Sequence, residues 1–126
     1  AANEPAANTS PAAAEAATDQ NAMATLHEIL ELMRSHHVLS ARDKLRSSGF
    51  SESRQMIIER YLETLDPGSH DPGGAMNRAL AEIQTYSQEH EADFVAPLLL
   101  SRIYARAENE KLAKVFLGQA RRLAYA

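Results

Sequence analysis

Apolar residues recur every three or four positions along most of the chain from Met23 onward. In the first of these stretches, Leu26, Ile29, Leu30 and Met33 fall on one face of a helix. Further stretches with the same period predict helices over about residues 23–36, 40–48, 52–65, 75–88, 94–107 and 111–125. Because no long segment alternates apolar and polar residues, we expect no β-sheet and an all-α fold.

Turn and cap residues mark where several of these helices begin or end. Thr25 followed by Glu28 has the spacing of a capping box, which predicts a helix start. Gly49 is placed to end the second helix. Residues 66–74, DPGSHDPGG, contain two Asp-Pro-Gly turns and interrupt any helical pattern. We expect this segment to be a mobile linker, with a lip of a binding surface as the alternative.

The first 22 residues differ in composition from the rest of the chain. They contain ten alanines and no Leu, Ile, Val or aromatic residue. Such a segment buries too little apolar surface to offset its ordering entropy. We therefore expect residues 1–22 to be a disordered tail or linker, and residues 23–126 to form one helical domain.

A 34-residue period links the second half of the chain to itself. A stripe on the fourth predicted helix, Ala79, Ile83 and Tyr86, recurs on the sixth as Ala113, Leu117 and Ala120. The fifth and sixth helices are separated only by the residues ENE, which predicts an antiparallel hairpin. Six helices joined by short connections suggest three hairpins packed side by side.

The last hairpin resembles the tetratricopeptide repeat, a 34-residue helix-turn-helix. The residues that carry this likeness are Leu100, Tyr104, Ala113, Leu117 and Ala120, and the resemblance extends over residues 52–126. It implies a TPR-like solenoid of stacked hairpins with a groove lined by the first helix of each hairpin. An irregular helical bundle is the alternative.

The resemblance also implies a function and a site. The function would be a non-enzymatic protein–protein interaction module, such as an adaptor, scaffold, assembly factor or secretion-type chaperone of the bacterial kind, holding a partner's peptide or helix. The expected partner-binding residues are Gln55, Glu59, Glu63, Leu98, Arg102 and Arg106. Arg102 and Arg106 share a helix face. They either pair with Glu59 and Glu63 or bind an acidic group of a partner.

Candidate catalytic and metal-binding chemistry is sparse. The chain has no cysteine, which excludes disulfides and thiolate chemistry. His36 and His37 are adjacent and point apart, and no histidine pair has the i,i+4 spacing of a helical metal site. Ser69, His70 and Asp71 are too close in sequence to form a triad. We expect no enzyme, no metal and no cofactor.

Charge gives no sign of a nucleic-acid partner. Of 17 acidic residues, three lie in residues 1–22, so 14 remain against 13 Lys and Arg. A helix-turn-helix DNA-binding domain over residues 40–62 is the alternative; its cations would be Arg42, Lys44, Arg46 and Arg54. No apolar run is long enough to insert into a membrane. The sequence leaves open a cytoplasmic or periplasmic location, and the chain could be a domain of a larger or membrane-anchored protein. It also leaves homo-oligomerisation open.

Overall fold

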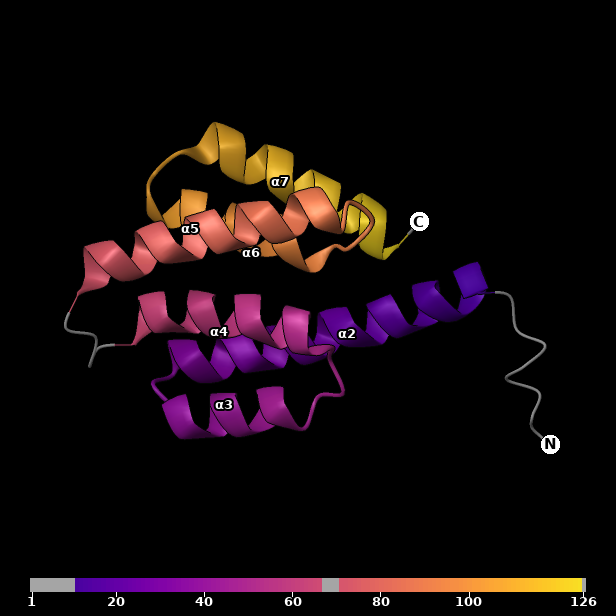
Figure 1. Cartoon of the computed structure of the whole chain (residues 1–126), viewed down its shortest axis with the longest axis horizontal. Coiled ribbons are helices and arrows are strands. Elements are labelled where there is room, and N and C mark those ends of the chain that lie inside the picture. The colour runs from indigo at the N-terminus through magenta and orange to yellow at the C-terminus, as the bar shows by residue number, and fades with distance from the viewer. Residues whose placement is uncertain (1–10, 67–70, 126) are drawn as a thin grey trace.

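The computed structural model describes residues 11–66 and 71–125, and this part of the chain is folded into helices without strands. The predicted all-α fold is confirmed (Figure 1). The helices are α2 (Pro11–Arg34), α3 (Val38–Arg46), α4 (Glu52–Leu65), α5 (Pro72–Glu89), α6 (Val95–Arg106) and α7 (Glu110–Ala124). Their order and number within the described residues agree with the six helices expected from the apolar spacing.

Consecutive helices pack in pairs. The most extensive contacts join α2 to α3, α4 to α5 and α6 to α7, and α5 also packs on α6. Helix α2 contacts α4 of the second pair and α7 of the last pair. In a linear repeat array each hairpin contacts only its neighbours. The pairing agrees with three hairpins, whereas the TPR-like solenoid stays a prediction.

Helix α2 begins earlier than the sequence pattern predicted. It starts at Pro11 and is 24 residues long, so the expected boundary at residue 22 falls inside it. Proline suits the first turn of a helix, and alanine has the highest helix propensity, which accounts for the early start. Ala22 and Met23 are both buried. The rest of the predicted tail, residues 1–10, lies outside the described residues.

Cap residues explain the bounds of the next helices. The Ser51 hydroxyl accepts a hydrogen bond from the Arg54 backbone N–H at 3.2 Å, and α4 begins at the predicted Glu52. The Asp71 carboxylate accepts from the Gly74 N–H at 3.0 Å, so the second Asp-Pro-Gly turn starts α5 instead of preceding it. Residues 67–70, part of the expected linker, lie outside the described residues. Thr25 is interior to α2 and is no cap.

Helix α6 is the most deeply buried element. Its residues 95–101 are all buried, and the Ser101 hydroxyl donates to the Leu98 carbonyl oxygen at 2.6 Å. That bond satisfies the one buried polar side chain within the described part of the chain. The predicted small-residue positions Ala79 and Ala120 are fully buried, as a close approach between helices requires, whereas Ala113, the counterpart of Ala79 in the 34-residue period, is half-exposed. The core is therefore built around α6, which packs against α4, α5 and α7.

A polar cluster joins the beginning of α4, the end of α5 and the beginning of α6. Arg54 Nε and Nη2 donate to the two Asp93 carboxylate oxygens at 2.8 and 2.9 Å, and the Tyr86 hydroxyl donates to the same carboxylate. The Val95 N–H donates to Asp93 Oδ1 at 3.0 Å. The guanidinium also lies within cation–π range of the Phe50 and Phe94 rings.

The cluster changes the titration of two of its members. Burial by itself would raise the pKa of the Asp93 carboxyl, but the hydrogen bonds from Arg54, Tyr86 and the Val95 N–H bring it below its ordinary value. The pKa of Tyr86 is raised, first by burial and then by its hydrogen bond to the Asp93 carboxylate. Asp93 is therefore ionised and Tyr86 is protonated at neutral pH.

Candidate partner-binding groove

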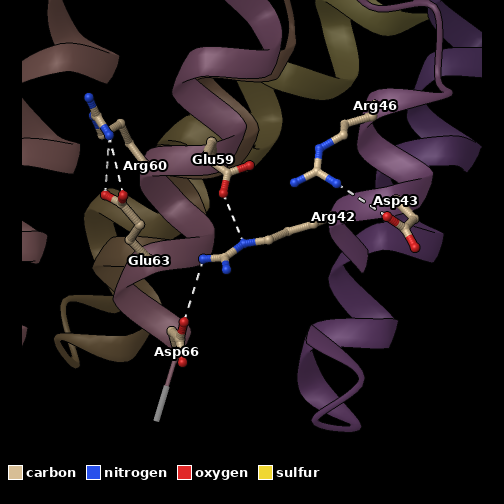
Figure 2. Close-up of polar contacts among 7 residues, drawn as sticks. All are labelled: Arg42, Asp43, Arg46, Glu59, Arg60, Glu63 and Asp66. Carbon is tan, nitrogen blue, oxygen red and sulfur yellow. Dashed lines mark hydrogen bonds and ion pairs between the residues drawn. The ribbon is translucent and has the colours of Figure 1, made fainter. Parts of the chain in front are cut away.

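The three site residues predicted on α4 are engaged within the fold. The Gln55 side-chain amide donates to the Phe50 carbonyl oxygen at 2.8 Å. Glu59 forms an ion pair with Arg42 Nε of α3 at 2.9 Å, and Glu63 forms one with Arg60 at 3.3 Å (Figure 2). The two α4 carboxylates therefore pair with arginines of the first two hairpins, Arg42 of α3 and Arg60 of α4.

The two predicted arginines of α6 do not pair with Glu59 or Glu63. Arg106 Nη1 donates to Thr64 Oγ1 at 2.8 Å, and its Nη2 donates to the Thr64 carbonyl oxygen at 3.1 Å, near the end of α4. Arg102 is half-buried and forms no ion pair with the described residues. Arg102 is therefore the predicted site cation that stays available for a partner.

Arg102 lies between two adjacent hollows in the protein surface. One, of about 340 Å³, lies between α2, α6 and α7, and we call it the basic hollow. Its apolar residues include Leu98, Ala105 and Leu117, and its cations are Arg102, Lys114 and Arg121. The other, of about 320 Å³, lies between α2, α4 and α6. The two share Arg102 and Ala105, so together they form one groove, the α2–α6 groove.

Three of the six predicted site residues lie in this groove. Leu98 and Arg102 line the basic hollow, and Arg106 lines the second one. Leu98 is almost completely buried and serves as floor, and Arg102 is half-buried. The sequence reasoning missed Lys114 and Arg121, which reach the hollow from α7, and His27, which reaches it from α2. A count of charge per hairpin would have pointed to the α7 residues.

Charge is divided unevenly along the chain. Residues 95–125, which contain α6 and α7, carry six Lys and Arg against two Glu, whereas the preceding residues carry seven against fifteen acids. Among the described residues, the cations of α6 and α7 form no ion pairs, while all six on α2, α3 and α4 do. The α6–α7 hairpin is thus a basic surface on an otherwise acidic chain.

His27 adds a titratable group to the rim of the basic hollow. Burial lowers the pKa of its imidazole, the positive charge of Arg102 lowers it further, and Glu31 opposes both effects. His27 is therefore mostly neutral at pH 7 in the free protein. A carboxylate bound beside it would favour the protonated form.

The four cations of the DNA-binding alternative are all engaged elsewhere. Arg42 pairs with Glu59 and Asp66, and Arg46 pairs with Asp43, as Figure 2 shows. Lys44 pairs with Glu28, and Arg54 pairs with Asp93. Contacts to phosphates would have to compete with these internal pairs. The geometry of residues 40–62 gives no support to a helix-turn-helix DNA-binding domain.

The described residues contain neither a metal-binding cluster nor a helix able to span a membrane. Residues 11–66 and 71–125 hold no group of three or more His, Asp or Glu side chains placed to bind a metal ion. In the same residues no helix has both the length and the apolar character needed to cross a membrane. Comparison of the chain with family models, curated proteins and solved structures finds no match.

Proposed function

We propose that the protein is a non-enzymatic interaction module that holds a peptide or helix of a protein partner in the α2–α6 groove. An adaptor or assembly factor would work in this way. The observation that carries the proposal is the basic hollow, in which the apolar Leu98 and Leu117 lie beside three cations without an acidic lining residue. We also propose that the three helical hairpins are related to tetratricopeptide repeats.

The groove has the composition of a peptide-binding surface. Amphipathic helices bind by placing apolar side chains on an apolar floor while polar side chains meet the rim. Arg42 and Arg60 form ion pairs within the fold, so their charges are less available to a partner. Arg102 forms no such ion pair with the described residues. Arg102 also lies where the two hollows meet, so one ligand could contact both.

A peptide-display selection tests the proposal. Random peptides are selected on the immobilised full chain and on Ala105→Trp, which places a large ring where the two hollows meet. The matched control is Ala107→Trp, at an exposed position just beyond α6. We expect the wild type and the control to enrich the same peptides and Ala105→Trp to lose them, with helicity unchanged in both variants.

Two results would contradict the proposal. One is that the wild type enriches no peptide. The other is that Ala105→Trp enriches the same peptides as the wild type, which would place the binding surface outside the α2–α6 groove.

A further inference from the structure

We infer that the partner of the basic hollow is an acidic amphipathic segment of another protein. In the complex, an apolar side chain of that segment lies on the apolar surface of Ala105, Ala113 and Leu117. The carboxylates of the segment contact Arg102, Lys114 and Arg121. This inference rests on the proposed function and adds the chemistry of the partner.

The apolar floor and the cationic rim of the basic hollow favour different chemical groups of one ligand. Leu117 and Ala113 are half-buried and Ala105 is exposed, so these three residues offer apolar surface to an incoming side chain, whereas Leu98, only 1% exposed, adds almost none. Burying such a side chain is favourable because it removes apolar area from water. The polar lining consists of three cations, His27 and the buried Ser101, whose hydroxyl donates to the Leu98 carbonyl oxygen, so the lining favours an anionic polar side of the ligand. An amphipathic segment with acidic side chains meets both requirements.

The spacing of the rim cations sets a pattern for the ligand. Lys114 and Arg121 are seven residues apart on α7, which is about two turns or roughly 10 Å along the same helix face. Arg102 reaches the hollow from α6. Two carboxylates seven residues apart on a helical ligand have the same separation. We therefore expect a ligand with Glu or Asp at such positions and a Leu-like residue between them.

The distribution of charge favours the same partner over longer distances. The α6–α7 hairpin has a net charge of +4, from six cations and two acids, whereas the whole chain has a net charge of −4. An acidic segment is attracted to this hairpin and repelled by the rest of the surface, so the charge distribution both guides and orients its approach.

Two other anionic partners fit the hollow less well. Single-stranded nucleic acid binds with its bases stacked on aromatic side chains, but no Phe, Tyr or Trp lines the basic hollow, and its one ring is the His27 imidazole. Tyr104 and Phe116, on the same hairpin, stack on each other at 5.6 Å between ring centroids. A flat anionic membrane contacts protruding cations; it would meet the exposed Lys114 and Arg121, but Arg102 is half-buried in a concave surface and would add little.

Fluorescence anisotropy with designed peptides tests the inference. The probe is a labelled helical peptide with two Glu seven residues apart and a Leu between them. Its two matched relatives carry Gln in place of each Glu, or Ser in place of the Leu. We expect the full chain to bind the acidic peptide at least about tenfold more tightly than either relative. The Gln peptide lacks the carboxylates that contact the cations, and the Ser peptide lacks the apolar side chain that contacts the floor.

A pair of double charge reversals locates the site. Lys114→Glu with Arg121→Glu removes two rim cations, and Lys111→Glu with Arg122→Glu makes the same change in charge at exposed positions of α7 that do not line the hollow. All four residues are exposed, so both proteins should keep their helicity. We expect the first to lose at least about tenfold in affinity and the second less than about threefold.

The possible outcomes separate the inference from the proposed function. Display-selected peptides that depend on Ala105 but carry no acidic residues would keep the proposed function and overturn the inference. Equal losses for the two double reversals would overturn it too, because binding would then follow net charge alone. So would tighter binding of an oligothymidine or of anionic vesicles, or a wild-type dimer in sedimentation that the Lys114/Arg121 reversal dissociates.

Discussion

Asp93→Asn should destabilise the protein strongly, because it removes the negative charge at the junction of α4, α5 and α6. The side chains of Arg54 and Asp93 are only 15% and 11% exposed, so water replaces the lost charge poorly. Breaking one side of a buried ion pair costs about 3–5 kcal/mol. An Asn side chain can still accept some of these hydrogen bonds, so we expect a loss of about 2–4 kcal/mol in the free energy of unfolding.

The pH dependence of this loss follows from the lowered pKa of Asp93. A carboxyl with a lower pKa in the folded state stabilises the fold fully above its unfolded pKa of about 3.9, and this stabilisation is lost as the pH falls through the folded value. The difference between the wild type and Asp93→Asn should therefore be constant from about pH 5 to pH 8 and shrink below about pH 4.

Urea unfolding followed by far-ultraviolet circular dichroism, repeated over this pH range, measures both effects. The matched control is Asp43→Asn, which breaks an ion pair with Arg46 whose side chains are 75% and 71% exposed. Exposed pairs contribute little, so the control should change the free energy of unfolding by less than about 0.5 kcal/mol. If Asp93→Asn costs no more than the control, the cluster does not hold the three helices together.

Three further results can be predicted. Ala120→Leu should overpack a fully buried position and destabilise by about 1–3 kcal/mol in thermal or urea unfolding, whereas Ala113→Leu, half-exposed at the basic hollow, should be tolerated. Met23→Ala should cost about 2–3 kcal/mol in the same assay; no effect would mean that this end of α2 does not pack on the domain. Binding of the acidic peptide should strengthen about threefold from about pH 8 to pH 6, because a bound carboxylate raises the pKa of His27, and His27→Gln should remove this dependence.

Helix bounds could be predicted best where they depend on residues that are close in sequence. The bounds of α4 agree with the prediction because the apolar spacing from Ile57 to Leu62 is a local signal, and the Ser51 cap that the structure shows is local as well. The start of α2 was misjudged for the opposite reason. An alanine-rich segment has no apolar stripe to recognise, although its helix propensity is high. The early start at Pro11 therefore had to come from the structure.

The groove could be predicted only in part. The four-residue spacing of Arg102 and Arg106 placed both on one side of α6, and both line the α2–α6 groove. The partners of Glu59 and Glu63 could not be read from spacing, because several arginines compete for them and packing decides which is closest. The contribution of His27 depends on where α2 lies across α6 and α7, a contact between residues far apart in sequence.

The contact between α2 and α7 has a consequence for how the protein unfolds. A linear array of hairpins can lose an end unit while the remaining units stay folded, because stability is a sum of neighbouring interfaces. Here the first described helix is in contact with the last. Detachment of α7 also removes contacts from α2, and loss of α2 exposes α4 and α7. Both ends are therefore coupled, and the helices should melt together in a single cooperative transition without fraying from one end.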